Sequence, residues 1–252
     1  MKKMFFSAMA ALLILTSPAA AHYLWLNMDN QVFEAGETVA VKLGWGHRFP
    51  GGEPMREGML RRVFAVDPQG NIAPLSPASD IEYRFIPKMS GAYRLYADIH
   101  PGFVSKTTEG YKMKPKNAVT EPLSCFRYDI RAGARIRVGE SNPDKTAFTE
   151  HPLEVVPLAD PTRVKIGDIL PVKVLFNGVA LAGAQIDATY AGDSEKADEF
   201  AITLNTGKDG TADIAISDKG LWLVSATYEP PYPEPAVCDI YRYKFSLTFT
   251  VP

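Results

Sequence analysis

Several features that mark other protein classes are missing from this chain of 252 residues. Two cysteines are too few for a disulfide-rich scaffold or a four-thiolate zinc site. The formal net charge of −2 lacks the basic excess of a nucleic-acid-binding protein, so we expect no nucleic-acid partner. Beyond the first residues, no apolar run is long enough to cross a membrane as a helix, and no helical periodicity continues past about 12 residues. These absences exclude helical bundles and multi-span membrane proteins.

Common catalytic motifs are also absent. The chain has no G-x-S-x-G nucleophile elbow, no H-E-x-x-H zinc motif, no P-loop and no dinucleotide fingerprint. Carboxylates are plentiful, but no pair of them is placed in the sequence as an acid–base couple. We therefore propose no catalytic residues and do not expect an enzyme.

The first 21 residues have the pattern of a secretory signal peptide. Lys2 and Lys3 precede an apolar stretch over residues 4–16, which is too short for a comfortable membrane span. Ala19 and Ala21 then occupy the two small-residue positions of an A-x-A cleavage site. We expect cleavage after Ala21 and export to the periplasm, with an uncleaved membrane anchor as the alternative.

The rest of the chain is predicted to form short β-strands. Apolar residues alternate with other residues in six segments, the period of a strand with one buried face: 39–43, 83–85, 93–95, 136–138, 172–176 and 245–251. Turn-forming sequences lie at residues 67–70, 177–178, 208–210 and 218–220. This pattern predicts an all-β protein of immunoglobulin-like or transthyretin-like sandwiches.

An internal similarity divides the chain. Residues 35–43 resemble residues 166–174, and residues 91–97 resemble residues 220–226, in the same order and at nearly equal spacing. We therefore predict two consecutive β-sandwich domains, 22–150 and 151–252, with the boundary in the proline-containing segment 151–161. Within the first domain, residues 101–140 carry several lysines and few apolar runs, and we expect this segment to be irregular.

Cleavage after Ala21 would make His22 the mature N-terminus. A terminal histidine can offer its α-amino nitrogen and its imidazole Nδ1 to the same metal ion, which no internal histidine can do. Imidazole nitrogen suits nickel, copper, zinc and iron. His22 is therefore a candidate metal ligand, the alternative being a histidine left there by chance.

Three further histidines differ in their surroundings. His47 follows a predicted strand and is flanked by Gly46 and by Gly51, so its imidazole is expected at the mouth of a loop, as a ligand or as an ordinary surface side chain. His100 ends another strand and could converge with His22 and His47. His151 is expected to be structural.

Two other groups of sulfur-containing residues could bind soft metals. Met55 and Met59 would suit Cu(I), although gap-filling in the core is the more ordinary role of methionine. Cys125 and Cys238 are expected to form a disulfide in an oxidising compartment; the alternative is that each thiol is a soft metal ligand.

Several motifs together resemble one known family. They are the A-H-x-x-W-L sequence at 21–26, the G-H-x-F loop at 46–49, the K-T-x-x-G-Y sequence at 106–111, and similar stretches at 153–161, 181–184 and 238–239. In this order they resemble the domain-of-unknown-function 4198 (DUF4198) family over nearly the whole chain after residue 21. Many members have a second histidine directly after the first in the G-H loop, where this chain has Arg48.

The resemblance implies a function in metal handling. It points to the branch of periplasmic accessory proteins of energy-coupling-factor nickel/cobalt uptake systems, and implies that His22 and His47 are ligands. We accordingly expect an exported protein that binds nickel or cobalt and delivers it to a membrane permease. The alternatives are a periplasmic copper-binding protein, a copper oxygenase that uses the terminal histidine, or a structural envelope module without metal.

Overall fold

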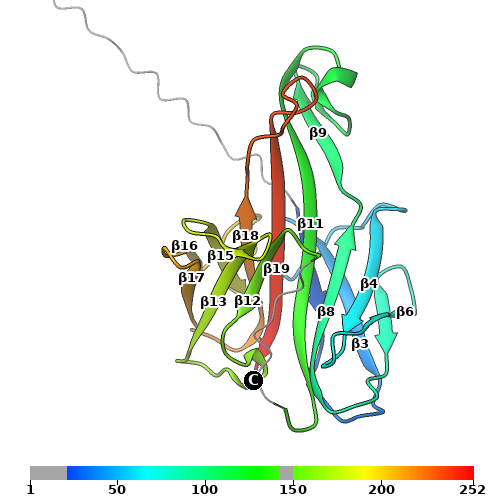
Figure 1. Ribbon diagram of the computed structural model, residues 1–252, viewed down its shortest axis with the longest axis vertical. Helices are drawn as coiled ribbons and strands as arrows, with labels where there is room; N and C mark the ends of the chain where they lie inside the picture. The colour runs from blue at the N-terminus through cyan, green and yellow to red at the C-terminus, as the bar shows by residue number, and fades with distance from the viewer. Residues whose placement is uncertain (1–21, 142–149) are drawn as a thin grey trace, which may run out of the picture.

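The computed structural model describes residues 22–141 and 150–252, and within them the chain is almost entirely β-structure (Figure 1). The predicted signal peptide lies outside the described residues. Strands hold 53% of the chain and helices 3%, so the predicted all-β class is confirmed. The described residues contain no helix that is long and apolar enough to span a membrane.

The strands form three sheets. The first has the order β1 (Tyr23–Asn27), β3 (Val39–Gly46), β7 (Glu82–Phe85), β6 (Ser76–Pro77). The third contains β12 (Leu153–Pro157), β13 (Ile169–Phe176), β14 (Val179–Ala180) and β17 (Thr211–Ala215). Between them is a central sheet of eleven strands, which includes β11, the longest strand of the described chain.

The central sheet has one continuous path of eight strands and three more strands off this path. The path is β16 (Ile202–Asn205), β15 (Gln185–Tyr190), β18 (Gly220–Tyr228), β19 (Ile240–Val251), β11 (Pro122–Val138), β8 (Gly91–Ile99), β4 (Leu60–Val66) and β5 (Ile72–Pro74). Strands β2 (Val32–Phe33) and β9 (Gly102–Thr107) pair with β11, and β10 (Gly110–Lys112) pairs with β9. Two short 3₁₀ helices complete the described elements, η1 (Lys116–Ala118) and η2 (Pro161–Arg163).

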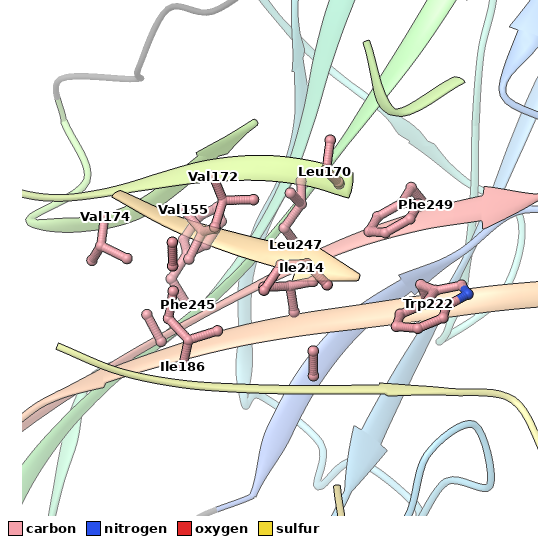
Figure 2. Packing of buried hydrophobic residues seen from close by; sticks show 14 of the residues in the cluster. Val155, Leu170, Val172, Val174, Ile186, Ile214, Trp222, Phe245, Leu247 and Phe249 are labelled. Atoms are coloured by element: carbon pink, nitrogen blue, oxygen red, sulfur yellow. The ribbon is translucent and has the colours of Figure 1, made fainter. Parts of the chain in front are cut away.

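The two small sheets pack on opposite faces of the central sheet. Successive side chains of a strand point to opposite faces, and in β4 the residues Val63 and Ala65 belong to the core under the first sheet, whereas Phe64 and Val66 belong to the core under the third. Figure 2 shows the second of these cores, with Trp222 of β18 and Phe249 of β19 facing the valines of β12 and β13. The molecule is thus two offset sandwiches that share their middle sheet.

The predicted halves are joined by backbone hydrogen bonds. Strand β19, from the end of the chain, runs parallel to β11 from Phe126↔Ile240 to Ala134↔Thr248. The central sheet therefore continues across the predicted boundary between residues 150 and 151. The internal similarity has a structural counterpart, because Gly36 and Gly167 both turn the chain with positive φ angles of 93° and 91° before β3 and β13. Only glycine adopts this conformation without strain.

Residues 101–140, which we expected to be irregular, instead form β9, β10 and β11. A strand signal was present there, because apolar residues alternate with other residues from Phe126 to Val138, and the prediction used only its last part at 136–138. From Ile130 to Ile136 every residue of β11 is buried, because sheets cover both of its faces. The residues between the apolar ones, Arg131, Gly133 and Arg135, are therefore buried as well. The segment also holds Arg131 and Arg135, whose charges are paired inside the protein with Asp129 and Glu154.

Candidate functional site

Strand pairing brings His22 next to His47. Tyr23 of β1 lies opposite Gly46 of β3 in the antiparallel register, so the residue before β1 meets the residue after β3. The two imidazole centroids are 4.1 Å apart, with 50° between the ring planes. Two residues separated by 25 positions in sequence therefore lie side by side at one end of the first sheet.

A carboxylate completes the group. His22 Nε2 lies 3.2 Å from Glu53 Oε2. One potential ligand atom each from His22, His47 and Glu53 all lie within 4.8 Å of one another, and this is the one such group of three or more among the residues that the structure describes. The side chains are 36%, 22% and 50% exposed, so the group lies at the surface where an ion can enter.

Two glycines allow the backbone to pack closely around these residues. A Cβ atom at Gly44 would lie 2.0 Å from the Trp25 indole, so only glycine fits there. Gly46 has a φ of 141°, and the backbone N–H of Glu53 donates to the Trp45 carbonyl at 2.6 Å. This hydrogen bond folds the loop of residues 47–52 back, which places Glu53 beside His22.

Aromatic stacking orients the His22 ring. It lies almost parallel to Trp45, with 7° between the planes and 4.8 Å between centroids. Offset stacking of this kind fixes the plane of the imidazole at little entropic cost. The ring edge that carries the nitrogens is thereby directed along the surface toward the other members of the group.

The His47 ring is oriented from the other half of the chain. Its Nδ1 lies 3.2 Å from the carboxylate of Asp198, in the segment between β15 and β16. The backbone N–H of Asp198 also donates to the His47 carbonyl at 2.9 Å. If Nδ1 carries the proton and donates it to Asp198, Nε2 keeps its lone pair, which is the usual state of a histidine that binds a metal.

The electrostatics of His22 and Glu53 favour their unprotonated forms. Burial, and then the neighbouring charge of His47, lower the pKa of His22, and the Glu53 carboxylate opposes this only in part. Burial is the largest single effect on Glu53 and favours its neutral form, but the hydrogen bonds and charges of His22 and His47 together outweigh it and lower the pKa of Glu53. At neutral pH the site therefore offers a neutral imidazole at His22 and a carboxylate at Glu53.

A buried lysine lies beneath the site. Lys244 of β19 has its Nζ 3.5 Å from the ring centroid of Tyr23, the residue after His22. Burial, followed by the charge of Arg242, lowers the pKa of Lys244 to about 7. A lysine with this pKa is partly uncharged at neutral pH.

The structure brings only some of the predicted metal ligands together. His22 and His47 meet, but His100 does not belong to their group: it is exposed at the end of β8, where its backbone N–H donates to the Met59 carbonyl. Met55 and Met59 pack against the hydrophobic core under the first sheet. Glu53 was missed, although its place after Gly51-Gly52 in the His47 loop was an available signal.

The remaining candidates have structural surroundings. His151 is buried at 2% exposure, and its Nε2 lies 3.0 Å from Asp98. Cys125 and Cys238 form a disulfide, which confirms that prediction, and no free cysteine is left as a soft ligand. The bridge joins the beginning of β11 to the segment before β19.

A small cleft adjoins His47 on the side of Asp198. Its walls include Tyr23, Phe49, Phe200 and Leu223, and its open volume is about 10 Å³. A volume of that size holds about one water molecule. The cleft lies between residues of the two halves of the chain, next to His47.

Comparison with known proteins identifies one family model. The model described as "Domain of unknown function (DUF4198)" matches residues 19–230. No curated protein gives a significant match.

The chain is also similar to solved β-structures of low identity. The D00-D0 domain of intimin is 15% identical and covers 91% of this chain and 99% of its own, with a TM-score of 0.22. The adhesin InvE of Yersinia pseudotuberculosis is 14% identical and covers 90% and 58%, with a TM-score of 0.22. The α-2-macroglobulin of Escherichia coli is 10% identical and covers 90% and 15%, with a TM-score of 0.24. At these low identities and TM-scores, the similarities say nothing about the function of this chain.

Proposed function

This chain belongs to the DUF4198 family, and on that premise we propose that it binds one divalent transition-metal ion at His22, His47 and Glu53. The observation that carries the proposal is the convergence of three potential ligand atoms within 4.8 Å from two loops that are far apart in sequence. Imidazole nitrogen with one carboxylate oxygen is a donor set for nickel, cobalt, copper, zinc and iron(II).

Two binding modes are open to these side chains. In the first, Glu53 is itself a ligand together with one nitrogen of each imidazole. In the second, cleavage after Ala21 frees the α-amine of His22, which chelates the ion with Nδ1 of the same residue. The second mode leaves His22 Nε2 hydrogen-bonded to Glu53, at the observed 3.2 Å.

In the second mode both histidines have the same supporting arrangement. Glu53 would hold the outer nitrogen of His22, and Asp198 holds the outer nitrogen of His47. Carboxylates in this position fix the tautomer and the orientation of metal-binding histidines. The ligands would then be three nitrogens, namely the α-amine, Nδ1 of His22 and Nε2 of His47.

The family resemblance favours nickel or cobalt, with capture in the periplasm and delivery to a membrane uptake system. The nitrogen-only mode supports copper as the second candidate, because copper binds such sites most tightly of the first-row divalent ions. We propose binding and hand-over in preference to catalysis, because the family resemblance points to metal handling and the sequence has none of the common catalytic motifs.

The proposal is tested with protein that begins at His22. Calorimetric titration and native mass spectrometry with nickel, cobalt, copper, zinc and iron(II) should give one ion per chain. His47→Ala should weaken binding at least about tenfold, because it removes a ligand and leaves its partner Asp198 in place. His100→Ala is the matched control and should bind as tightly as the unchanged protein.

Two outcomes would contradict the proposal. Protein that binds none of the ions would support a structural envelope module. Equal losses in the His47→Ala and His100→Ala proteins would place the ion elsewhere.

A further inference from the structure

The connection between β15 and β16 reaches the candidate metal site from the second half of the chain. We define the clasp as residues 191–201, which join these two strands at one edge of the central sheet. The backbone N–H of Asp198 in the clasp donates to the His47 carbonyl at 2.9 Å, and its carboxylate lies 3.2 Å from His47 Nδ1. One residue of the clasp thus holds both the backbone and the ring of a proposed ligand.

Only a small apolar contact supports this docking. Of the clasp residues, Phe200 alone belongs to a hydrophobic cluster of the described chain, and its ring meets that of Tyr23 edge to face with 5.5 Å between centroids. Ser194, Lys196 and Glu199 line the cleft described above, and the side chains of the first two donate to Glu199 within the clasp. A segment with few buried contacts opens at low cost in free energy.

The backbone of the clasp enters the left-handed region at two points. Gly192 has a φ of 96° and Asp198 a φ of 55°. Glycine adopts such angles freely, whereas they are uncommon and strained for a residue with a side chain. Strain of this kind persists only where the surroundings hold it. The two hydrogen bonds to His47 hold Asp198 in this conformation, so the shape of the clasp and its docking on His47 depend on each other.

Docking changes what His47 offers to an ion. When Asp198 accepts the proton of Nδ1, Nε2 keeps its lone pair and the ring has a fixed orientation, which favours ligation. Without this contact, either nitrogen can carry the proton and the ring can rotate. A docked clasp and a bound ion therefore favour each other, and by thermodynamic linkage the two effects have the same size.

We propose that the clasp is a release device for the metal ion. Docked, it holds His47 ready for ligation; undocked, it lowers the affinity of the site, so that the ion can be handed over. This inference rests on the proposed metal site and adds to it a moving element from the second sandwich. A group that supports a ligand histidine contributes about tenfold to metal affinity, so the bound ion should favour the docked clasp about tenfold as well.

Hydrogen exchange measures the docking directly. The test uses protein that begins at His22, with and without nickel, and follows exchange by mass spectrometry. In the peptide that contains Asp198, exchange of the amide that donates to His47 should slow about tenfold when nickel is bound. The amide of Asn177, which donates to the Pro152 carbonyl at 2.7 Å, is the control and should exchange at the same rate in both states.

A glycine substitution changes the docking without touching a ligand. Gly192→Ala places a side chain in a left-handed conformation, which is strained although no atom lies within 4 Å of the new Cβ. Gly178→Ala is the matched control, because Gly178 has a φ of 77° and equally open surroundings but lies in the turn between β13 and β14.

The two alanine variants should differ in metal binding. Gly192→Ala should lower nickel affinity about fivefold, since the strain falls on the docked clasp, and should speed exchange of the Asp198 amide in the ion-free protein. Gly178→Ala should match the unchanged protein in both measurements. Phe200→Ala is an independent variant that removes the contact with Tyr23, and it should act in the same direction as Gly192→Ala.

The outcomes separate the clasp from the metal site. Nickel binding that leaves exchange of the Asp198 amide unchanged would overturn the release role while the metal site stands. Equal nickel affinities for Gly192→Ala and Gly178→Ala would overturn it as well. If neither nickel nor copper binds, the metal site is contradicted, and the release role with it. Circular dichroism of each variant establishes that a loss of affinity is not a loss of fold.

Discussion

The imidazole Nδ1 of His47 lies 3.2 Å from the carboxylate of Asp198, a residue 151 positions later in the chain. The first belongs to the loop after β3 and the second to the segment between β15 and β16. The contact links a candidate metal ligand in the first half of the chain to its supporting carboxylate in the second half. A metal site at His22 and His47 would thus depend on both sandwiches.

The contact between Asp198 and His47 predicts that Asp198 supports metal binding. We expect Asp198→Asn to lower metal affinity about tenfold or more, because loss of the carboxylate releases the His47 ring from its orientation. Calorimetric titration measures the change. Glu195→Gln, an exposed carboxylate of the same segment, is the control, and equal affinities for Asp198→Asn and the unchanged protein would contradict the role.

The chelate mode predicts sensitivity at the first residue. One glycine added before His22 displaces the α-amine and puts a peptide nitrogen in its place. We expect affinity for cobalt and zinc to fall at least about tenfold, as it does when even a supporting group is lost. For copper and nickel, which can displace the proton of a peptide nitrogen, the geometry should change instead.

The same experiment separates the two binding modes. If Glu53 is the third ligand and the amine takes no part, the added glycine leaves affinity unchanged, whereas Glu53→Gln lowers it. Proton release during calorimetric titration provides the second readout, because the amine releases a proton on binding at neutral pH.

Metal affinity should fall as the pH decreases, since protons compete with the ion for imidazole nitrogen. The buried position of His22 and the charge of His47 lower the pKa of His22 below its ordinary value of about 6.5. His22 therefore stays unprotonated at neutral pH and through the range just below it. If Glu53 is the third ligand, we expect similar affinity at about pH 7 and at about pH 6.5, whereas the chelate mode predicts a fall already in this range, because the α-amine is mostly protonated there. Both modes predict much weaker binding near pH 5. Equal affinity at about pH 7 and pH 5 in calorimetric titration would contradict imidazole ligation.

The surroundings of Asp98 predict how the free energy of unfolding depends on pH. Burial acts to raise its pKa, but the hydrogen bond and charge of His151, the charge of Arg131 and the hydrogen bond from Arg62 outweigh burial and lower the pKa. An aspartate with a lowered pKa stabilises the fold above its unfolded pKa of about 3.9, and this contribution is lost as the pH falls through the folded value.

We therefore expect Asp98→Asn to lower the free energy of unfolding by about 3–5 kcal/mol at neutral pH, the cost of breaking a buried ion pair. The difference from the unchanged protein should shrink below about pH 4. Urea unfolding at several pH values measures it. Asp213→Asn, at an exposed position of β17, serves as the control; a pH-independent difference for Asp98→Asn would refute the assignment.

The disulfide should stabilise the protein without contributing to metal binding. It closes a loop with a sequence separation of 113, for which the chain-entropy relation gives about 4–5 kcal/mol. Cys125→Ser with Cys238→Ser should lower the urea midpoint accordingly and leave metal affinity unchanged. Labelling of the unreduced, denatured protein should find no thiols; two per chain would show that the bridge does not form.

Local sequence determined a large part of this protein. The alternation at 39–43 and 172–176 predicted β3 and β13, because a strand with one face buried repeats every two residues. The Asn177–Gly178 sequence predicted the turn between β13 and β14, where both residues have positive φ angles of 51° and 77°. Glycines at the ends of strands marked the internal similarity, since few other residues adopt their backbone conformation.

Some features could not be predicted because their causes are not local. Strand β11 alternates between apolar and other residues from Phe126 to Val138, so the strand itself was predictable. The alternation does not show that the other face of the strand, which carries Arg131 and Arg135, is buried as well. The pairing of β11 with β19 depends on the topology of the whole sheet, and this pairing makes the two sandwiches share one sheet.

The candidate site, too, could be predicted from the sequence only in part. The sequence itself placed a histidine before the first strand and another in a glycine loop after the next predicted strand, so His22 and His47 were available as candidates. Only the tertiary structure decided that they meet while His100 stays apart, because the register of β1 on β3 sets which residues are neighbours. Glu53 lies at the site because the loop of residues 47–52 folds back. Asp198 lies there because the second sandwich packs against the first. Those contacts depend on distances between segments, which a linear sequence does not specify.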